Sequence, residues 1–185
     1  MVAETPDLDL RARLLQAARD ELAEHGYGQL SLRAIARRTG VSHAAPAYSF
    51  GDRAGLLTAV VAQGFRELAR DLDAPFGAGE DPLAVLGRRY VGFAQRNPAL
   101  YELMFRPDEF NAANEELAEA RIAALRRLTI VTAGEEKAPT ALTLVSWALA
   151  HGVATLGSQG ALRTVAEAVD PAGLIDAYAL LVSPS

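Results

Sequence analysis

The chain has 185 residues, of which 50% are hydrophobic, enough to form one compact domain or two small ones that share a core. It contains no cysteine, which excludes disulfide frameworks, zinc ribbons and iron–sulfur clusters and favours the reducing cytoplasm as its compartment. The first residues are acidic and polar rather than basic and apolar, so we expect no secretory signal peptide.

Charge is distributed unevenly along the chain. The formal net charge is −5, and residues 58–185, with 11 basic and 16 acidic side chains, account for all of it. The segment from Gln29 to Arg53, in contrast, has a local net charge of +3. It contains four basic residues, Arg33, Arg37, Arg38 and Arg53, and one acidic residue, Asp52. A positive patch on an acidic protein favours short, specific anionic sites over a non-specific coating of nucleic acid.

Apolar residues recur at helical spacing almost throughout the chain, which predicts an all-α fold. A first helix is expected over residues 8–25, closed by Gly26. Ser31 is expected to cap a short second helix, Gly40 to form a tight turn, and Ser42 to cap a third helix.

Further helix starts follow from capping residues. Asp52 is expected to cap a fourth helix with a continuous apolar face, and residues 73–81, which contain proline and glycine, are expected to form a linker. Each of three Asx-Pro pairs places a capping side chain before a proline. The remaining expected helices cover residues 81–96, 97–105, 111–132, 138–157 and 170–182, about nine helices in all.

The uncharged stretch of residues 138–162 has the length of a membrane span. It contains several polar residues, among them Thr143, Ser146 and His151, which are costly in hydrocarbon. We therefore expect a buried or subunit-facing helix and no membrane partner.

The segment from Ser31 to Phe50 has the layout of a helix-turn-helix. Two helices that are too short to be stable alone are expected to pack through Ala36, Val41 and Ala45 across the turn at Gly40. The alternative is an ordinary helical hairpin with a solvated basic face.

The region from Gly26 to Leu57 resembles the DNA-binding region of the TetR family of bacterial transcriptional regulators. The matching positions are Gly26-Tyr27, Ser31, Ile35-Ala36, Gly40-Val41-Ser42, Phe50 and Arg53. The resemblance implies a homodimer that binds a palindromic DNA operator as a repressor, and a small-molecule effector that releases it.

The resemblance also implies roles for individual side chains. Ser31 and Arg53 would hold phosphates, while Ser42, His43 and Ala44 would face bases. The chain departs from the family's Tyr-x-His-Phe pattern, because it has Ala47-Tyr48-Ser49-Phe50, and it carries an unusual Pro46. The predicted DNA-binding set is Ser31, Arg33, Ser42, His43, Ala44, Tyr48, Ser49 and Arg53.

We expect two domains, a three-helix DNA-binding domain over residues 1–53 and a helical bundle for ligand binding and dimerisation over residues 54–185. Most of the aromatic residues lie in the second. The expected ligand-binding residues are Tyr90, Phe93, Tyr101, Met104, Phe105, Phe110, Trp147 and His151. An ordinary hydrophobic core is the alternative for each of them.

Small and apolar residues on the last two long helices are expected to form the dimer interface. The expected residues are Ala148, Gly152, Leu174, Tyr178 and Leu181. The alternative is that both helices lie inside a monomer.

Nothing in the sequence indicates catalysis. The three histidines lie apart, none has an acidic residue three or four positions later, and no phosphate-binding glycine loop is present. We expect no enzyme activity, cofactor or metal. The alternative is an all-α small-molecule-binding protein or enzyme with a vestigial DNA-binding head.

Overall fold

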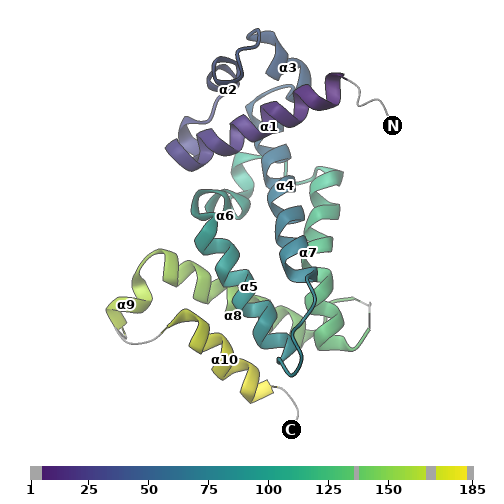
Figure 1. The fold of residues 1–185 in the computed structure, drawn as a ribbon, viewed down its shortest axis with the longest axis vertical. Coiled ribbons are helices and arrows are strands. Elements are labelled where there is room, and N and C mark those ends of the chain that lie inside the picture. The colour runs from purple at the N-terminus through teal and green to yellow at the C-terminus, as the bar shows by residue number, and fades with distance from the viewer. Residues whose placement is uncertain (1–5, 136–137, 166–169, 183–185) are drawn as a thin grey trace. The chain divides into compact units, whose positions relative to one another are not determined.

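The computed structural model describes residues 6–135, 138–165 and 170–182, and these residues form α-helices and two short 3-10 helices without any strand (Figure 1). The all-α prediction is confirmed. The helices are α1 (Pro6–His25), η1 (Tyr27–Gln29), α2 (Leu32–Thr39), α3 (Ala44–Phe50), α4 (Arg53–Asp73), α5 (Pro82–Arg96), α6 (Pro98–Met104), η2 (Pro107–Glu109), α7 (Glu115–Ala133), α8 (Ala141–Ser158), α9 (Ala161–Val165) and α10 (Pro171–Val182).

The described residues belong to two compact units. The first comprises residues from Met1–Gly64 and Ala99–Glu119, and the second comprises residues from Phe65–Pro98 and Ala120–Ser185. Helices α4 and α7 therefore contribute to both units. The predicted boundary between residues 53 and 54 lies within the first unit, and as a division by function it stays a prediction.

The first unit is built on α1, which packs against α2 and α3. Its apolar stripe is buried at Leu14, Ala18 and Leu22, and Ile35 and Ala36 of the adjoining α2 are buried as well. Burial of this stripe stabilises two helices of eight and seven residues that are too short to persist alone.

The second unit is built around α5, which packs against α8 and α10. Leu83, Ala84 and Ala179 form a buried cluster here. Polar pairs fix the helices relative to each other: Tyr178 and Ser146 hydroxyls lie 2.9 Å apart, and Arg88 on α5 pairs with Asp176 on α10.

Most of the predicted helix starts are confirmed. The Ser31 hydroxyl accepts a hydrogen bond from the Ala34 amide, and the Asp81 carboxylate accepts from the Leu83 and Ala84 amides. Asp52 accepts from the Gly55 amide at the start of α4. Capping chemistry is local, and so it can be predicted from neighbouring residues.

Three predicted starts are wrong, and one of them is that of α8, which begins at Ala141 after its capping residue Thr140 rather than at residue 138. The third helix begins at Ala44, with His43 at the capping position and no side-chain capping bond, so Ser42 is not the cap. The charged helix begins at residue 115 rather than 111, because Asn111 accepts from the Ala113 amide in a turn of its own, and Asn114 caps α7 by accepting from the Leu117 amide.

Helix α8 matches the uncharged stretch of the sequence. By length and composition it could cross a membrane, with a mean hydropathy of 1.3 over 18 residues, and 28% of that window is buried. Thr143 and Ser146 are buried and hydrogen-bonded, whereas Leu144, Val145 and Leu156 are exposed. Within the described residues, α8 thus has one buried side whose polar side chains are hydrogen-bonded, and one exposed side that is apolar.

Candidate nucleic-acid interface

The turn between α2 and α3 depends on Gly40. This residue has φ 70° and ψ 24°, the left-handed conformation that costs other residues energy. Its amide and that of Val41 donate to carbonyls of the last turn of α2, the latter to Ala36 at 3.2 Å. The chain therefore reverses within a few residues and brings α3 against α2, as the sequence predicts.

The exposed side of α3 contains four of the predicted DNA-binding residues. Ser42, His43 and Ala44 are exposed around the start of the helix, and the Tyr48 side chain is 86% exposed one turn later. Ala47 is exposed beside them, which sequence reasoning missed although its spacing from Ala44 could have indicated it. A row of small side chains with one hydroxyl, one imidazole and one phenol can approach base edges closely.

Pro46 lies on the opposite side of α3 and is buried. As the third residue of the helix it occupies the first turn, where backbone amides have no partner within the helix. Its missing amide therefore costs α3 no internal hydrogen bond. Ser49 is half-buried and lines an open groove of about 230 Å³ that also includes Arg11 and Thr58.

The basic residues of α2 divide into two kinds. Arg33 and Arg37 are exposed and lie one turn apart, and the structure gives neither a carboxylate partner among the described residues. Arg37 was not in the predicted set, although its spacing from Arg33 is visible in the sequence. Both side chains are available to bind phosphate.

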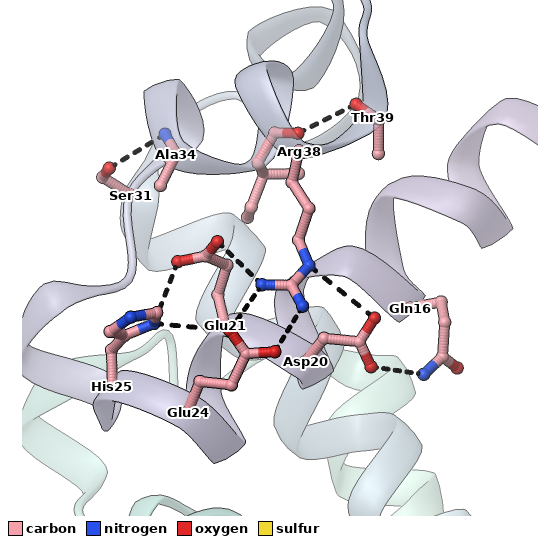
Figure 2. Close-up of polar contacts among 10 residues, drawn as sticks. Gln16, Asp20, Glu21, Glu24, His25, Ser31, Ala34, Arg38 and Thr39 are labelled. Atoms are coloured by element: carbon pink, nitrogen blue, oxygen red, sulfur yellow. Dashed lines mark hydrogen bonds and ion pairs between the residues drawn. The ribbon is translucent and has the colours of Figure 1, made fainter.

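Arg38, in contrast, is held by carboxylates of α1 (Figure 2). Its guanidinium donates to Glu21 at 3.0 Å and to both oxygens of Glu24, and its Nε lies 3.8 Å from Asp20. The hydrogen bonds to Glu24 and Glu21 raise the pKa of Arg38, and the same contact lowers the pKa of Glu24. Arg38 therefore adds little free positive charge to the surface of the first unit.

Arg53, the first residue of α4, makes three contacts away from α4. Its Nε donates to the Leu30 carbonyl at 3.1 Å, its Nη2 to the Tyr27 carbonyl at 2.8 Å, and its Nη1 to the Glu109 carboxylate at 3.0 Å. The predicted phosphate contact of Arg53 stays a prediction. The positive patch counted from the sequence is nevertheless smaller than expected, because Arg38 and Arg53 are both paired with carboxylates from outside the segment.

The predicted phosphate ligand Ser31 has a structural bond as well. Its oxygen accepts from the Ala34 amide at 3.2 Å, which leaves the hydroxyl hydrogen free to donate outward. The residue is half-buried at the start of α2. A capping serine can thus bind a phosphate oxygen without losing its capping bond.

The predicted ligand-binding residues are divided between the two units. In the second unit, the Tyr90 hydroxyl lies 3.0 Å from His151 Nδ1, and the Trp147 and His151 ring centroids are 5.8 Å apart. Phe93 in the same unit is 1% exposed. Tyr101, Met104, Phe105 and Phe110 belong to the first unit. A common pocket for these eight residues stays a prediction.

Burial lowers the pKa of His151, because a half-buried imidazolium loses part of its hydration. The neutral ring can either accept or donate toward Tyr90, depending on its tautomer. This part of the second unit is therefore a cluster of polar and aromatic groups, formed by Tyr90, His151 and Trp147. In small-molecule sites, a few polar groups among aromatic side chains fix the orientation of the ligand.

The predicted dimer residues differ in exposure. Ala148 is exposed and Leu181 is 84% exposed, while Gly152, Leu174 and Tyr178 are half-buried. A Cβ atom built on Gly152 would contact nothing within 4 Å, so the backbone of α8 is open there. Tyr178 is bonded to Ser146 in the same chain, so its hydroxyl is already used within the protomer.

Metal chemistry has no candidate among the described residues, since no three of their His, Asp and Glu side chains are grouped to hold an ion. Expected absences of cofactor and catalysis stay predictions.

Comparisons with known proteins agree with this geometry. Residues 14–60 match the family model of bacterial regulatory proteins of the tetR family, and residues 83–177 match the tetracyclin repressor-like C-terminal domain. The HTH-type transcriptional regulators Mb1846 of Mycobacterium bovis and Rv1816 of Mycobacterium tuberculosis are each 30% identical over 101 residues. That alignment covers 52% of this chain and 43% of theirs, so the chain spans less than half the length of these curated relatives.

Solved structures match over nearly the whole chain. A protein of unknown function from Rhodococcus sp. RHA1 is 31% identical with a TM-score of 0.72, and the match covers 93% of this chain and 92% of that one. The candidate regulatory protein SCO4313 is 25% identical with a TM-score of 0.76, over 96% and 97% of the two chains. The chain belongs to the TetR family of bacterial regulatory proteins.

Proposed function

We propose that this protein is a DNA-binding transcriptional regulator that acts as a homodimer, represses from a palindromic operator and is released by a small-molecule effector. The observation that carries the proposal is the exposed face of α3, which follows a Ser31-capped α2 and a Gly40 turn. This arrangement suits insertion of α3 into the major groove.

In this proposal, residues at the start of α3 recognise the bases. Ser42, His43 and Ala44 are exposed and small enough for close approach, and Tyr48 extends the same face. Arg33, Ser31 and Ser49 contact the backbone, together with Arg53 when its guanidinium is free. Phosphate contacts would then fix the register of the head while α3 selects the sequence.

Dimerisation is assigned to the exposed apolar sides of α8 and α10. Leu144, Val145 and Leu156 on α8 and Leu180 and Leu181 on α10 are all at least 45% exposed. Apolar patches of this kind on a protein in water mark an interaction surface. A two-fold symmetric dimer buries each such residue twice and presents two α3 helices to the two halves of a palindrome.

The effector is assigned to the second unit, near Tyr90, Trp147 and His151. An effector that binds more tightly to a dimer whose α3 helices no longer match two half-sites shifts the population away from DNA. We assign the protein to the cytoplasm, where it acts without catalysis.

The decisive experiment measures binding of the purified protein to DNA from its own upstream region, with a scrambled duplex as competitor, over a series of salt concentrations. We expect competitor-resistant binding and a palindromic footprint. Absence of a specific site in a genome-wide selection as well would overturn the proposal, and turnover of a small molecule by the same preparation would then favour an enzyme with a vestigial head.

A further inference from the structure

Glu109 is the only carboxylate that the structure pairs with Arg53 among the described residues. It lies in η2, and its Oε2 atom is 3.0 Å from Arg53 Nη1 although 56 positions separate the two in the sequence. Both residues belong to the first compact unit. The pair therefore joins the loop between α6 and α7 to the start of α4.

The guanidinium of Arg53 is fixed on one side and open on the other. Three of its five N–H groups are used, by the Leu30 carbonyl, the Tyr27 carbonyl and Glu109. The Arg53 side chain is 40% exposed and that of Glu109 33% exposed. The two backbone carbonyls hold the arginine in place whether or not the carboxylate stays bound.

We propose that Glu109 is an internal competitor of DNA phosphate for Arg53. The inference rests on the proposed DNA-binding function. A carboxylate and a phosphate offer the same charged oxygen acceptors to a guanidinium, so one can replace the other at Nη1. Arg53 then contributes a phosphate contact only to the extent that DNA displaces Glu109.

The exposure of the pair makes this exchange feasible. Ion pairs with this degree of solvent contact contribute little net stability, so a phosphate brought close by α2 and α3 can displace the carboxylate. Arg38 is the contrasting case. Three carboxylates of α1 surround it, so one incoming phosphate cannot replace them all.

The loop itself does not depend on the ion pair. The Asn111 amide donates to the Thr58 hydroxyl at 3.0 Å, and the Arg106 guanidinium lies 5.1 Å from the centre of the Tyr27 ring. Arg106 has its own carboxylate partner, Glu102, at 2.7 Å. Glu109→Gln should therefore leave the loop in place and remove only the charge.

The test compares binding of a short mixed-sequence duplex to the full chain and to Glu109→Gln over a salt series, because phosphate contacts need no particular sequence. We expect Glu109→Gln to bind several-fold more tightly at low salt and to steepen the logarithmic salt slope by roughly 0.9, the value for one further phosphate contact. The double variant Arg53→Met/Glu109→Gln should lose both gains.

Asp108→Asn provides the matched control. Asp108 is the exposed neighbour of Glu109 in η2, so its replacement changes the net charge equally without touching Arg53. An equal gain for Asp108→Asn, or a gain that survives Arg53→Met, would overturn the competition. An unchanged slope for Glu109→Gln with a lower melting temperature would make the pair a purely structural contact. If the wild-type chain bound no duplex at all, the proposed function itself would fail.

Discussion

The two compact units differ in what they expose. Among the described residues of the first unit, Tyr48 is the only large hydrophobic side chain that is exposed. The second unit exposes leucines and valines along α8 and α10. Under the proposed function, the first unit contacts DNA, and the apolar surface of the second unit contacts another copy of the chain.

The same contrast holds for the fixed charges. In the first unit, Arg33 has no carboxylate partner among the described residues, whereas Arg38 is paired with carboxylates of α1. In the second unit, Arg88 joins α5 to α10 and Arg96 joins α5 to Asp71 at 2.6 Å. Ion pairs in the second unit hold helices together. In the first unit, ion pairs also determine which arginine side chains remain available to bind phosphate.

The largest expected effect comes from charging the apolar side of the second unit. Leu181→Glu should raise the dimer dissociation constant at least about a hundredfold, because each buried leucine contributes about 1.5–3 kcal/mol and a two-fold interface loses it twice. Sedimentation equilibrium measures this. Gln159→Glu, an equal charge at an exposed polar position, should leave assembly unchanged, and a dimer unaffected by Leu181→Glu would refute the assigned interface.

A smaller effect is expected at His43, the residue of the first unit that we propose faces the bases. His43→Ala should lose about 1–3 kcal/mol of discrimination at one base-pair position of each half-site while its affinity for unrelated duplex stays the same. Competition binding with single-base variants of the selected site measures this. A uniform loss on every sequence would show that His43 contacts the backbone instead.

In the second unit, Tyr90→Phe should lower the free energy of unfolding by about 0.5–1.5 kcal/mol, because His151 Nδ1 loses its partner. Stability should also depend on pH. Since burial lowers the pKa of His151 in the folded state, the unfolded chain binds more protons below about 6.5, so stability is complete above that pH and falls below it. Urea titrations at several pH values test both effects, and His151→Gln should remove this pH-dependent component.

The smallest expected effect separates the two kinds of arginine in the head. Arg33→Met should reduce the logarithmic salt slope of duplex binding by roughly 0.9, whereas Arg38→Met should leave the slope unchanged and lower the melting temperature. The physical reason is that Arg38 already has carboxylate partners and supports Glu21, which is 7% exposed. Equal slopes for both variants would contradict this division.

Sequence reasoning predicted most of what depends on neighbouring residues, although Ser42 as a cap and residue 111 as a helix start were wrong. Ser31, Asp52 and Asp81 cap helices as expected, and Gly40 turns the chain, because each acts within a few positions. It missed partners that only folding brings near. Nothing next to Arg53 indicates Glu109.

The predicted aromatic pocket shows the same limit. Helical spacing identified Tyr90 and the pair Trp147 and His151, and the structure joins all three. Spacing cannot tell that Tyr101 and Phe105, with ring centroids 5.1 Å apart, belong to the other compact unit. Which residues share a core is decided by the whole fold, so this part of the site was beyond sequence reasoning.

The way α3 is held has a consequence for how such regulators diversify. The helix has no side-chain cap, and its fixed points are the buried Pro46 and its packing against α1 and α2. The exposed positions 42, 43, 44 and 48 therefore contribute little to folding. Under the proposed function, substitutions there redirect the protein to new operators during evolution while the scaffold that carries them stays intact.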